Sequence, residues 1–118
     1  MLGRAIPWLA IGAVSWVSSI PAASLPDLSR IPGGDKWLHG AAFFLLILSF
    51  RGWRGPGREL SEWLLPAVFI LLAFAVADEL HQSRVPGRVA DLADGLADAG
   101  GIALGALLVW LNGRSRIR

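Results

Sequence analysis

Long runs of apolar residues, separated by shorter polar segments, dominate the sequence. Their approximate limits are 5–20, 36–50, 62–82 and 91–111. Most are long enough for a helix to cross the hydrocarbon of a bilayer, which is about 30 Å thick, although the second is short. The pattern predicts an all-α integral membrane bundle of four transmembrane helices, formed by a single domain over residues 1–118.

Local signals predict where these helices begin and end. Pro7 and Pro66 are expected in first helical turns, where a missing amide costs little. Asp35 follows a Pro- and Gly-rich linker and is expected to be the N-cap of the second helix. Asn112-Gly113 is a C-terminal stop signal for the fourth helix.

The composition supports a membrane protein and excludes several classes of site. The chain is 54% hydrophobic and only 17% charged, and it contains no cysteine. A soluble domain is usually less apolar, and without cysteine no disulfide, zinc–thiolate site or thiol nucleophile can form. The pI near 10.4 is compatible with nucleic-acid binding. The basic residues cluster at the ends of the apolar runs, however, so we expect no nucleic-acid partner.

Basic residues also predict the orientation in the membrane. The N-terminus, the second loop and the C-terminal tail carry Arg4, Arg51, Arg54, Arg58, Arg114, Arg116 and Arg118. The first and third loops carry Arg30, Lys36, Arg84 and Arg88. By the positive-inside rule, both termini are expected in the cytoplasm. Residues 1–23 also have signal-peptide features, but Trp8 and Trp16 fit interface anchors of a retained helix.

Acidic residues are concentrated near the outward ends of the predicted helices. A helix rise of about 1.5 Å per residue places several polar side chains in one layer near the outer leaflet. That layer contains Asp35, His39, Asp78, Asp94 and Asp98. Asp35 shares a helix face with His39, and Asp78 shares one with Gln82. Because lipid penalises charges, these faces are expected to turn inward.

This layer has the residue types for acid–base or metal chemistry. The candidate catalytic residues are Asp78, Glu79, His39, Asp94 and Asp98. The candidate substrate-binding residues are Lys36, Gln82, Arg88, Asp35 and Asp91. Carboxylates and a histidine can bind a divalent metal, although no spacing here matches a known metal signature.

Each candidate also has a structural interpretation. The basic residues can simply neutralise the acids or anchor at headgroups, and His39 can be a hydrogen-bonded packing residue. Asp91 is best explained as the N-cap of the fourth helix. Ser18 and Ser19, at the end of the first run, could pair with His39 as in a hydrolase, but serines are common at helix ends.

Small residues predict a close helix contact beside the acidic layer. Gly101 and Gly105 form a Gly-x-x-x-Gly pair, continued by Ala93 and Ala97. Such a ridge lets two helix backbones approach. The contact can lie within the bundle, or it can join two copies of the chain in an oligomer.

The ordered motifs resemble the VanZ-like family. They are Asp35-Lys36-x-x-His39, Asp78-Glu79-x-x-Gln82, Pro86-Gly87-Arg88, Asp91 and Gly101-x-x-x-Gly105, preceded by Ser18-Ser19. The resemblance implies a multi-pass protein of the bacterial inner membrane and a family link to teicoplanin resistance. We expect membrane lipids and a lipid-linked cell-wall precursor as partners. Asp98 departs from the family pattern, which usually has asparagine there.

These observations leave three functions open. The first is an enzyme that modifies a lipid-linked envelope component at the outer leaflet. The second is a non-catalytic accessory or lipid-binding protein whose polar layer is a structural ion-pair network. The third, a proton-coupled transporter, needs a polar path toward the cytoplasm, where the sequence offers only Glu59 and Glu62.

Overall fold

The computed structural model describes residues 2–27, 30–32, 34–55 and 57–115. The helices are α1 (Leu2–Ser18), α2 (Asp35–Ser49), α3 (Leu60–Gln82) and α4 (Leu92–Ser115), with the 3-10 segments η1 (Ala22–Ser24) and η2 (Phe50–Gly52). The residues described contain no strand, so the all-α prediction is confirmed. Arg116 and Arg118, which contributed to the predicted orientation, lie outside these ranges.

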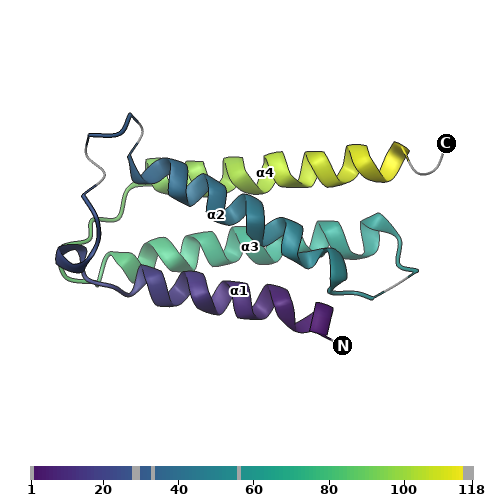
Figure 1. Cartoon of the computed structure of the whole chain (residues 1–118), viewed down its shortest axis with the longest axis horizontal. Coiled ribbons are helices and arrows are strands. Elements are labelled where there is room, and N and C mark those ends of the chain that lie inside the picture. Colours follow the sequence, from purple (N-terminus) through teal and green to yellow (C-terminus); the bar gives the residue numbers. More distant parts are fainter. Residues whose placement is uncertain (1, 28–29, 33, 56, 116–118) are drawn as a thin grey trace.

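The four helices lie side by side along the long axis of a bundle that measures 49 × 29 × 20 Å (Figure 1). The start of α1 and the end of α4 lie at one end of this axis. The α1–α2 connection and the α3–α4 turn lie at the other end, which we call the loop end. The positive-inside prediction requires the two termini to share a side, and the bundle satisfies this requirement.

Two of the four helices are long and apolar enough to cross a membrane by themselves. These are Leu60–Gln82 and Leu92–Gly113. At about 1.5 Å per residue, α3 and α4 each extend about 35 Å, whereas α1 and α2 extend only about 25 and 22 Å. The predicted four-span bundle is therefore supported for α3 and α4, and it stays a prediction for α1 and α2.

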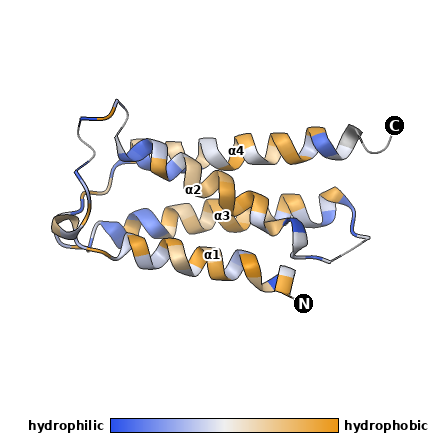
Figure 2. Cartoon of the chain, in the orientation of Figure 1, coloured by the Kyte–Doolittle hydropathy of each residue, from blue (hydrophilic) through white to orange (hydrophobic). Residues whose placement is uncertain are grey.

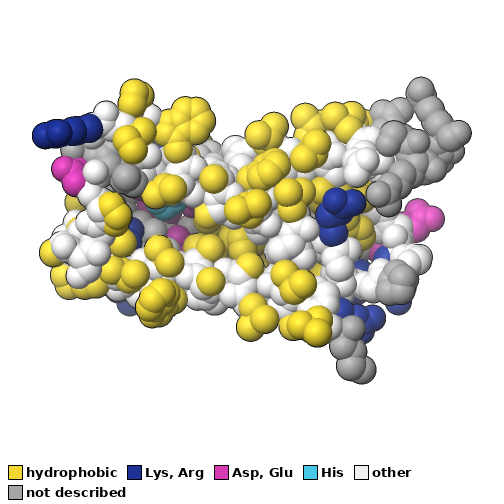
Figure 3. Space-filling model, viewed as in Figure 1, with side chains coloured by type: hydrophobic (Ala, Val, Ile, Leu, Met, Phe, Trp, Pro, Cys, Tyr) yellow, Lys and Arg dark blue, Asp and Glu magenta, His cyan; other side chains and the backbone are white. Residues whose placement is uncertain are grey.

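Apolar side chains cover the outside of the bundle as well as its core. Trp16 on α1 is 71% exposed, Leu45 on α2 is 63% exposed, and Phe69 on α3 is 64% exposed. The ribbon is apolar along most of each helix, and yellow side chains extend over most of the visible face (Figures 2 and 3). An apolar surface this extensive is typical of a protein that faces lipid or a partner.

The core occupies the middle of the bundle and the end nearer the termini. Its members include Leu46, Ile47, Phe50, Trp63 and Leu71. Near the termini, Trp8 and Trp53 make edge-to-face contacts with Phe50, at centroid distances of 5.8 and 5.3 Å. This packing leaves the polar layer at the loop end, between the helices.

The most extensive helix contact joins α2 to α4, through the predicted glycine ridge. A methyl group at Gly101 would collide with the carbonyl oxygen of Gly40, and one at Gly105 would collide with Ile47. The ridge therefore allows α2 and α4 backbones to touch. In this structure α2 of the same chain fills the Gly101/Gly105 face. The alternative, an oligomer through that face, stays a prediction.

Several predicted helix limits need correction. Gly34, with φ of +51°, is the N-cap of α2, and Asp35 is its first helical residue. Pro7 and Pro66 lie beyond the first turns, because α1 and α3 begin a few residues earlier than expected. The carboxylate of Glu62 accepts a hydrogen bond from the backbone N–H of Glu59, which fixes the earlier start of α3.

The expected end of α4 is also wrong. The helix continues through Asn112 and Gly113 to Ser115. A glycine signal ends a helix only where the backbone takes the left-handed conformation. Gly113 does not have a positive φ here, and it packs near Leu60 at the start of α3.

Candidate functional site

A histidine and two aspartates form the centre of the polar layer between α2 and α4. His39 Nδ1 lies 2.8 Å from Asp98 Oδ1, and His39 Nε2 lies 3.8 Å from Asp94 Oδ2. Asp98 is 0% exposed and Asp94 is 4% exposed. Because a carboxylate only accepts hydrogen bonds, Nδ1 carries the proton that it donates to Asp98. This proton fixes the tautomer and directs the other ring nitrogen toward Asp94.

Lys36 lies one turn from this histidine and contacts three carboxylates. Its Nζ lies 3.3 Å from Asp91 Oδ2, 3.4 Å from Asp94 Oδ1 and 3.8 Å from Asp35 Oδ1. Its charge is therefore already offset within the protein. This geometry agrees with the interpretation of Lys36 as a neutralising residue, and its predicted role in substrate binding stays a prediction.

Asp91 is the N-cap of α4, as its structural interpretation predicts. Its Oδ1 accepts a hydrogen bond of 2.9 Å from the backbone N–H of Ala93. That hydrogen bond, together with the Lys36 ammonium, lowers the pKa of Asp91 below its ordinary value of 3.8. The cap fixes the first turn of α4 and so positions Asp94 and Asp98 on the face that meets α2.

A second polar group joins α3 to the end of α1. Gln82 Nε2 donates to Asp78 Oδ2 at 3.2 Å and to Ser18 Oγ at 3.4 Å, and all three residues are buried. Ser19 Oγ lies 2.9 Å from His81 Nε2 on the exposed side. These serines bond to His81 and Gln82 on α3, and the suggested pairing of Ser18 or Ser19 with His39 stays a prediction.

Two further residues fasten the loop end. Arg88 donates from Nε to the carbonyl of Ile20 and from Nη2 to that of Val17, at 3.2 and 3.1 Å. These carbonyls lie at the C-terminal end of α1, where backbone acceptors lack helical partners. Glu79 Oε2 accepts from the backbone N–H of Asp91 at 3.2 Å. Arg88 therefore positions α1, and Glu79 positions the start of α4.

A cavity of about 910 Å³ opens between α1, α2 and α3 at the loop end. Its walls are mostly apolar and include Val14, Val17, Leu25, Leu38 and Phe43. Its polar lining consists of Ser18, Asp27, Asp35, His39, Asp78, Gln82 and Arg88. The cavity therefore brings five of the predicted site residues to one surface. The other predicted site residues, which are Lys36, Glu79, Asp91, Asp94 and Asp98, are not part of this lining.

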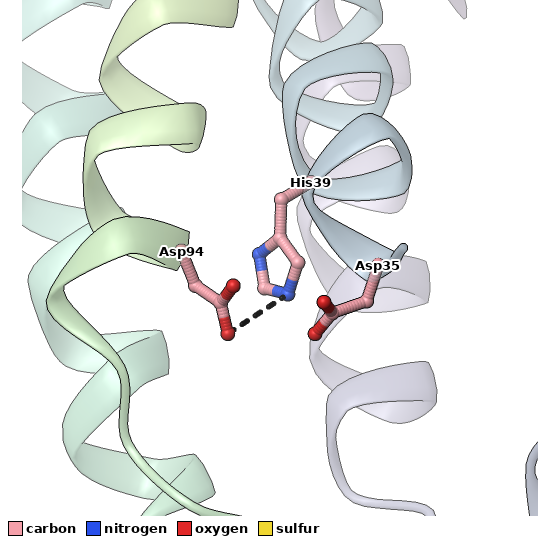
Figure 4. A group of neighbouring side chains, drawn as sticks. All are labelled: Asp35, His39 and Asp94. Carbon is pink, nitrogen blue, oxygen red and sulfur yellow. Dashed lines mark ion pairs between the residues drawn. The ribbon is translucent and has the colours of Figure 1, made fainter. Parts of the chain in front are cut away.

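The side chains around His39 can hold a cation. Asp35, His39 and Asp94 present ligand atoms that all lie within 4.8 Å of one another, and so do His39, Glu79 and Asp98. Figure 4 shows the carboxylates of Asp35 and Asp94 on either side of the Nε2 edge of the ring. Asp98 Oδ2 and Glu79 Oε1 are buried and have no hydrogen-bond partner among the described residues.

Sequence reasoning missed two contributions to this site. Asp27 lies in the Pro- and Ser-rich linker, and its place in the cavity lining depends on how that linker folds back over α1 and α2. The role of Arg88 in holding the end of α1 was also missed. Nothing in the sequence around Arg88 and its Pro-Gly turn predicts a hydrogen bond to carbonyls about 70 residues earlier in the chain.

Comparisons with known proteins place this arrangement in a family. No curated protein and no solved structure matches the chain significantly. A family model described as VanZ/LLP1 matches residues 8–113, which include all of α2 and α3, most of α1 and α4, and every residue of the polar layer. The chain therefore belongs to the VanZ/LLP1 family.

Proposed function

We propose that this protein is a four-span protein of the bacterial inner membrane whose cavity binds the headgroup of a lipid-linked envelope component at the outer leaflet. The observation that carries the proposal is the cavity itself, with apolar walls and a polar lining that includes buried Asp78 and Gln82. A site for a lipid needs both kinds of surface. The family link to teicoplanin resistance, a property of the envelope, agrees with it.

The surface of the bundle supports membrane insertion of all four helices. Large apolar side chains are exposed on α1 and α2 as they are on α3 and α4, for example Leu9, Trp37, Val76 and Leu104. Helices shorter than the hydrocarbon are accommodated by local thinning of the bilayer and by interfacial side chains. With the termini in the cytoplasm, the cavity opens toward the outer leaflet.

Charge in the cavity restricts what it can bind. Asp27, Asp35 and Asp78 contribute acids to the lining, whereas Arg88 is its single arginine. Arg88 Nη1 takes part in neither of the bonds to α1. We therefore expect one phosphate to bind at Arg88 and amine or hydroxyl groups of the headgroup to bind Asp78 and Gln82.

Site-specific photo-crosslinking tests the proposal directly. A photo-reactive leucine analogue at Leu25, in the cavity wall, should capture lipids with a larger polar headgroup than the bulk phospholipids. The same analogue at Leu80, which is 65% exposed on α3, is the matched control and should capture bulk lipids in proportion to their abundance. Mass spectrometry of the captured lipids provides the measurement. Identical lipid profiles at the two positions would reject the proposal.

A non-catalytic accessory role is the second candidate, and the three acid contacts of Lys36 favour it. The variant Asp78→Asn distinguishes the two, because Asn keeps the size and much of the hydrogen bonding of Asp. A binding or catalytic role predicts normal folded yield with loss of the enriched crosslink. An ion-pair network predicts lower folded yield. Teicoplanin susceptibility of a sensitive Gram-positive host, at matched membrane abundance, extends the comparison to the cell.

A further inference from the structure

We infer that Asp35, His39 and Asp94 form a binding site for a first-row divalent cation, with Asp98 as the residue that positions His39. The inference deepens the proposed function and rests on it, since the cation would lie at the edge of the cavity that receives the headgroup. It gives the acidic layer a ligand of stated chemistry.

The geometry places three ligand atoms around one point. Their mutual separations stay within 4.8 Å. Bonds of about 2.0–2.2 Å to a metal put ligand atoms roughly 3–4 Å apart, so a small inward rotation is enough. Asp35 is exposed on the first turn of α2 and can make this rotation, whereas Asp94 is held in place by burial.

Asp98 supplies the arrangement that usually accompanies a metal-bound histidine. Its Oδ1 accepts the Nδ1 proton of His39 at 2.8 Å. A carboxylate in this position fixes the ring and makes the other nitrogen a better ligand. The lone pair of Nε2 then points between the carboxylates of Asp35 and Asp94, as Figure 4 shows.

Burial of unpartnered carboxylate oxygens is a separate observation that points to a cation. Asp94 is 4% exposed, and its Oδ1 is buried without a hydrogen-bond partner among the residues described. The oxygens of Asp94 reach only the Lys36 ammonium at 3.4 Å and His39 Nε2 at 3.8 Å within the described part of the chain. Buried carboxylates with so little compensation are costly, and a bound cation removes that cost.

The donor set also selects the metal. One imidazole and two carboxylates suit Mn²⁺, Fe²⁺ or Zn²⁺, whereas Mg²⁺ prefers oxygen ligands and water. Protein ligands that leave open positions allow a phosphate or water to join the metal from the cavity. Lys36 contacts Asp94 through Oδ1, so Oδ2 stays directed toward the histidine.

Titration of the metal-stripped full chain in detergent with Mn²⁺ tests the site. Electron paramagnetic resonance of free Mn²⁺ gives the affinity, and nitrogen coupling in the bound signal reports a histidine ligand. His39→Gln should abolish the nitrogen coupling. Asp94→Asn and Asp35→Asn each remove a ligand and should weaken binding at least about tenfold. Asp98→Asn should weaken it by about tenfold, which is the lower end of the usual effect of removing a residue that supports a metal ligand. Asp35 is exposed, so its variant should fold whatever happens to the others.

An acid-to-amide variant serves as the control. Glu62→Gln, at the other end of the bundle beside Arg58, should leave the affinity unchanged. A larger loss of affinity in Glu79→Gln than in Asp94→Asn would move the metal to the group of His39, Glu79 and Asp98 and overturn the assignment. Absence of binding to wild type up to millimolar Mn²⁺ or Zn²⁺, or unchanged nitrogen coupling in His39→Gln, would also overturn it.

The outcomes for metal and lipid are separable. If the crosslink at Leu25 captures an enriched lipid but the chain binds no metal, only the cation site is rejected. If metal binds with the expected variant pattern but Leu25 captures bulk lipids alone, the proposed headgroup function is rejected and the metal site stands.

Discussion

The two sides of the loop end are built differently. Between α2 and α4, the polar contacts join charged groups. His39, Asp94 and Asp98 lie close to the glycine contact, where the backbones of the two helices touch. Between α1 and α3, the contacts are mostly neutral hydrogen bonds made by Gln82, Ser18 and Ser19, and the cavity opens beside them. The α2–α4 side is the closely packed one, and the α1–α3 side borders the cavity.

This difference assigns separate tasks to the two sides. Charged groups keep a defined geometry only where the backbone around them is rigid, which the α2–α4 contact provides. A ligand needs an opening, which the looser attachment of α1 provides. We therefore regard α2 and α4 as the scaffold of the site, and α1, held at its end by Arg88, as the wall that borders the cavity.

The largest effect is expected from closing the glycine contact. Gly101→Val would drive a side chain into the backbone of α2 at Gly40 and Phe44. We expect a loss of about 3 kcal/mol in the free energy of unfolding, the upper part of the usual overpacking range. Gly100→Val is the matched control, because Gly100 is exposed and has no atom within 4 Å of an added Cβ. Thermal unfolding in detergent should show that Gly101→Val is less stable than Gly100→Val. Equal stability of the two variants would contradict a close α2–α4 contact.

A smaller effect is expected on the neutral side. Gln82→Leu would remove the donor that serves both Asp78 and Ser18 in a buried position. Leaving buried acceptors unsatisfied costs about 1–3 kcal/mol. Ser19→Ala removes a hydrogen bond of the same region that is exposed, so it should change stability by less than about 0.5 kcal/mol. Chemical unfolding of the two variants measures the difference. A larger loss of stability in Ser19→Ala than in Gln82→Leu would contradict the view that the buried bonds stabilise the fold more than the exposed one.

Asp98→Asn should have the opposite sign. Asparagine keeps an oxygen that accepts the Nδ1 proton of His39, and it removes one of several neighbouring negative charges. We expect the metal-free variant to be as stable as wild type or slightly more stable, with weaker Mn²⁺ binding. A residue that is needed for binding, but whose replacement makes the folded protein more stable, is typical of a functional site. Melting curves with and without Mn²⁺ provide the check, and marked destabilisation without metal would make Asp98 a structural residue.

The sequence was sufficient for the main architecture because its signals are local. Helix periodicity and Gly-x-x-x-Gly spacing depend on one segment at a time, so Asp78 and Gln82 could be placed on one helix face before the helix opposite them was known. The partner helix was not predictable in this way. The glycine ridge has the same sequence whether it meets α2 of its own chain or another copy, and only the fold decides between them.

Side-chain partners were less predictable than helices for a related reason. His39 had three plausible roles from its sequence position, and only the 2.8 Å contact with Asp98 from a distant helix selects among its neighbours. Helix ends were misjudged where tertiary contacts override local signals. Gly113 is an example, because packing against Leu60 lets α4 continue past a residue that usually ends helices.

The smallest effect concerns the cap that positions the charged side. The pKa of Asp91 is lower in the folded chain than its ordinary value of 3.8, so the ionised form stabilises the fold above that value. This stabilisation is lost as the pH falls through the folded-state pKa. Asp91→Asn keeps a good capping side chain without a charge. We therefore expect the melting temperatures of wild type and Asp91→Asn to differ slightly at pH 7 and to differ less at pH 3. Asp91→Ala, which removes the cap itself, should stay less stable than Asp91→Asn at both values. If the difference between wild type and Asp91→Asn were the same at both pH values, the charge of Asp91 would contribute nothing, and Lys36 would owe its position to Asp94 and Asp35 alone.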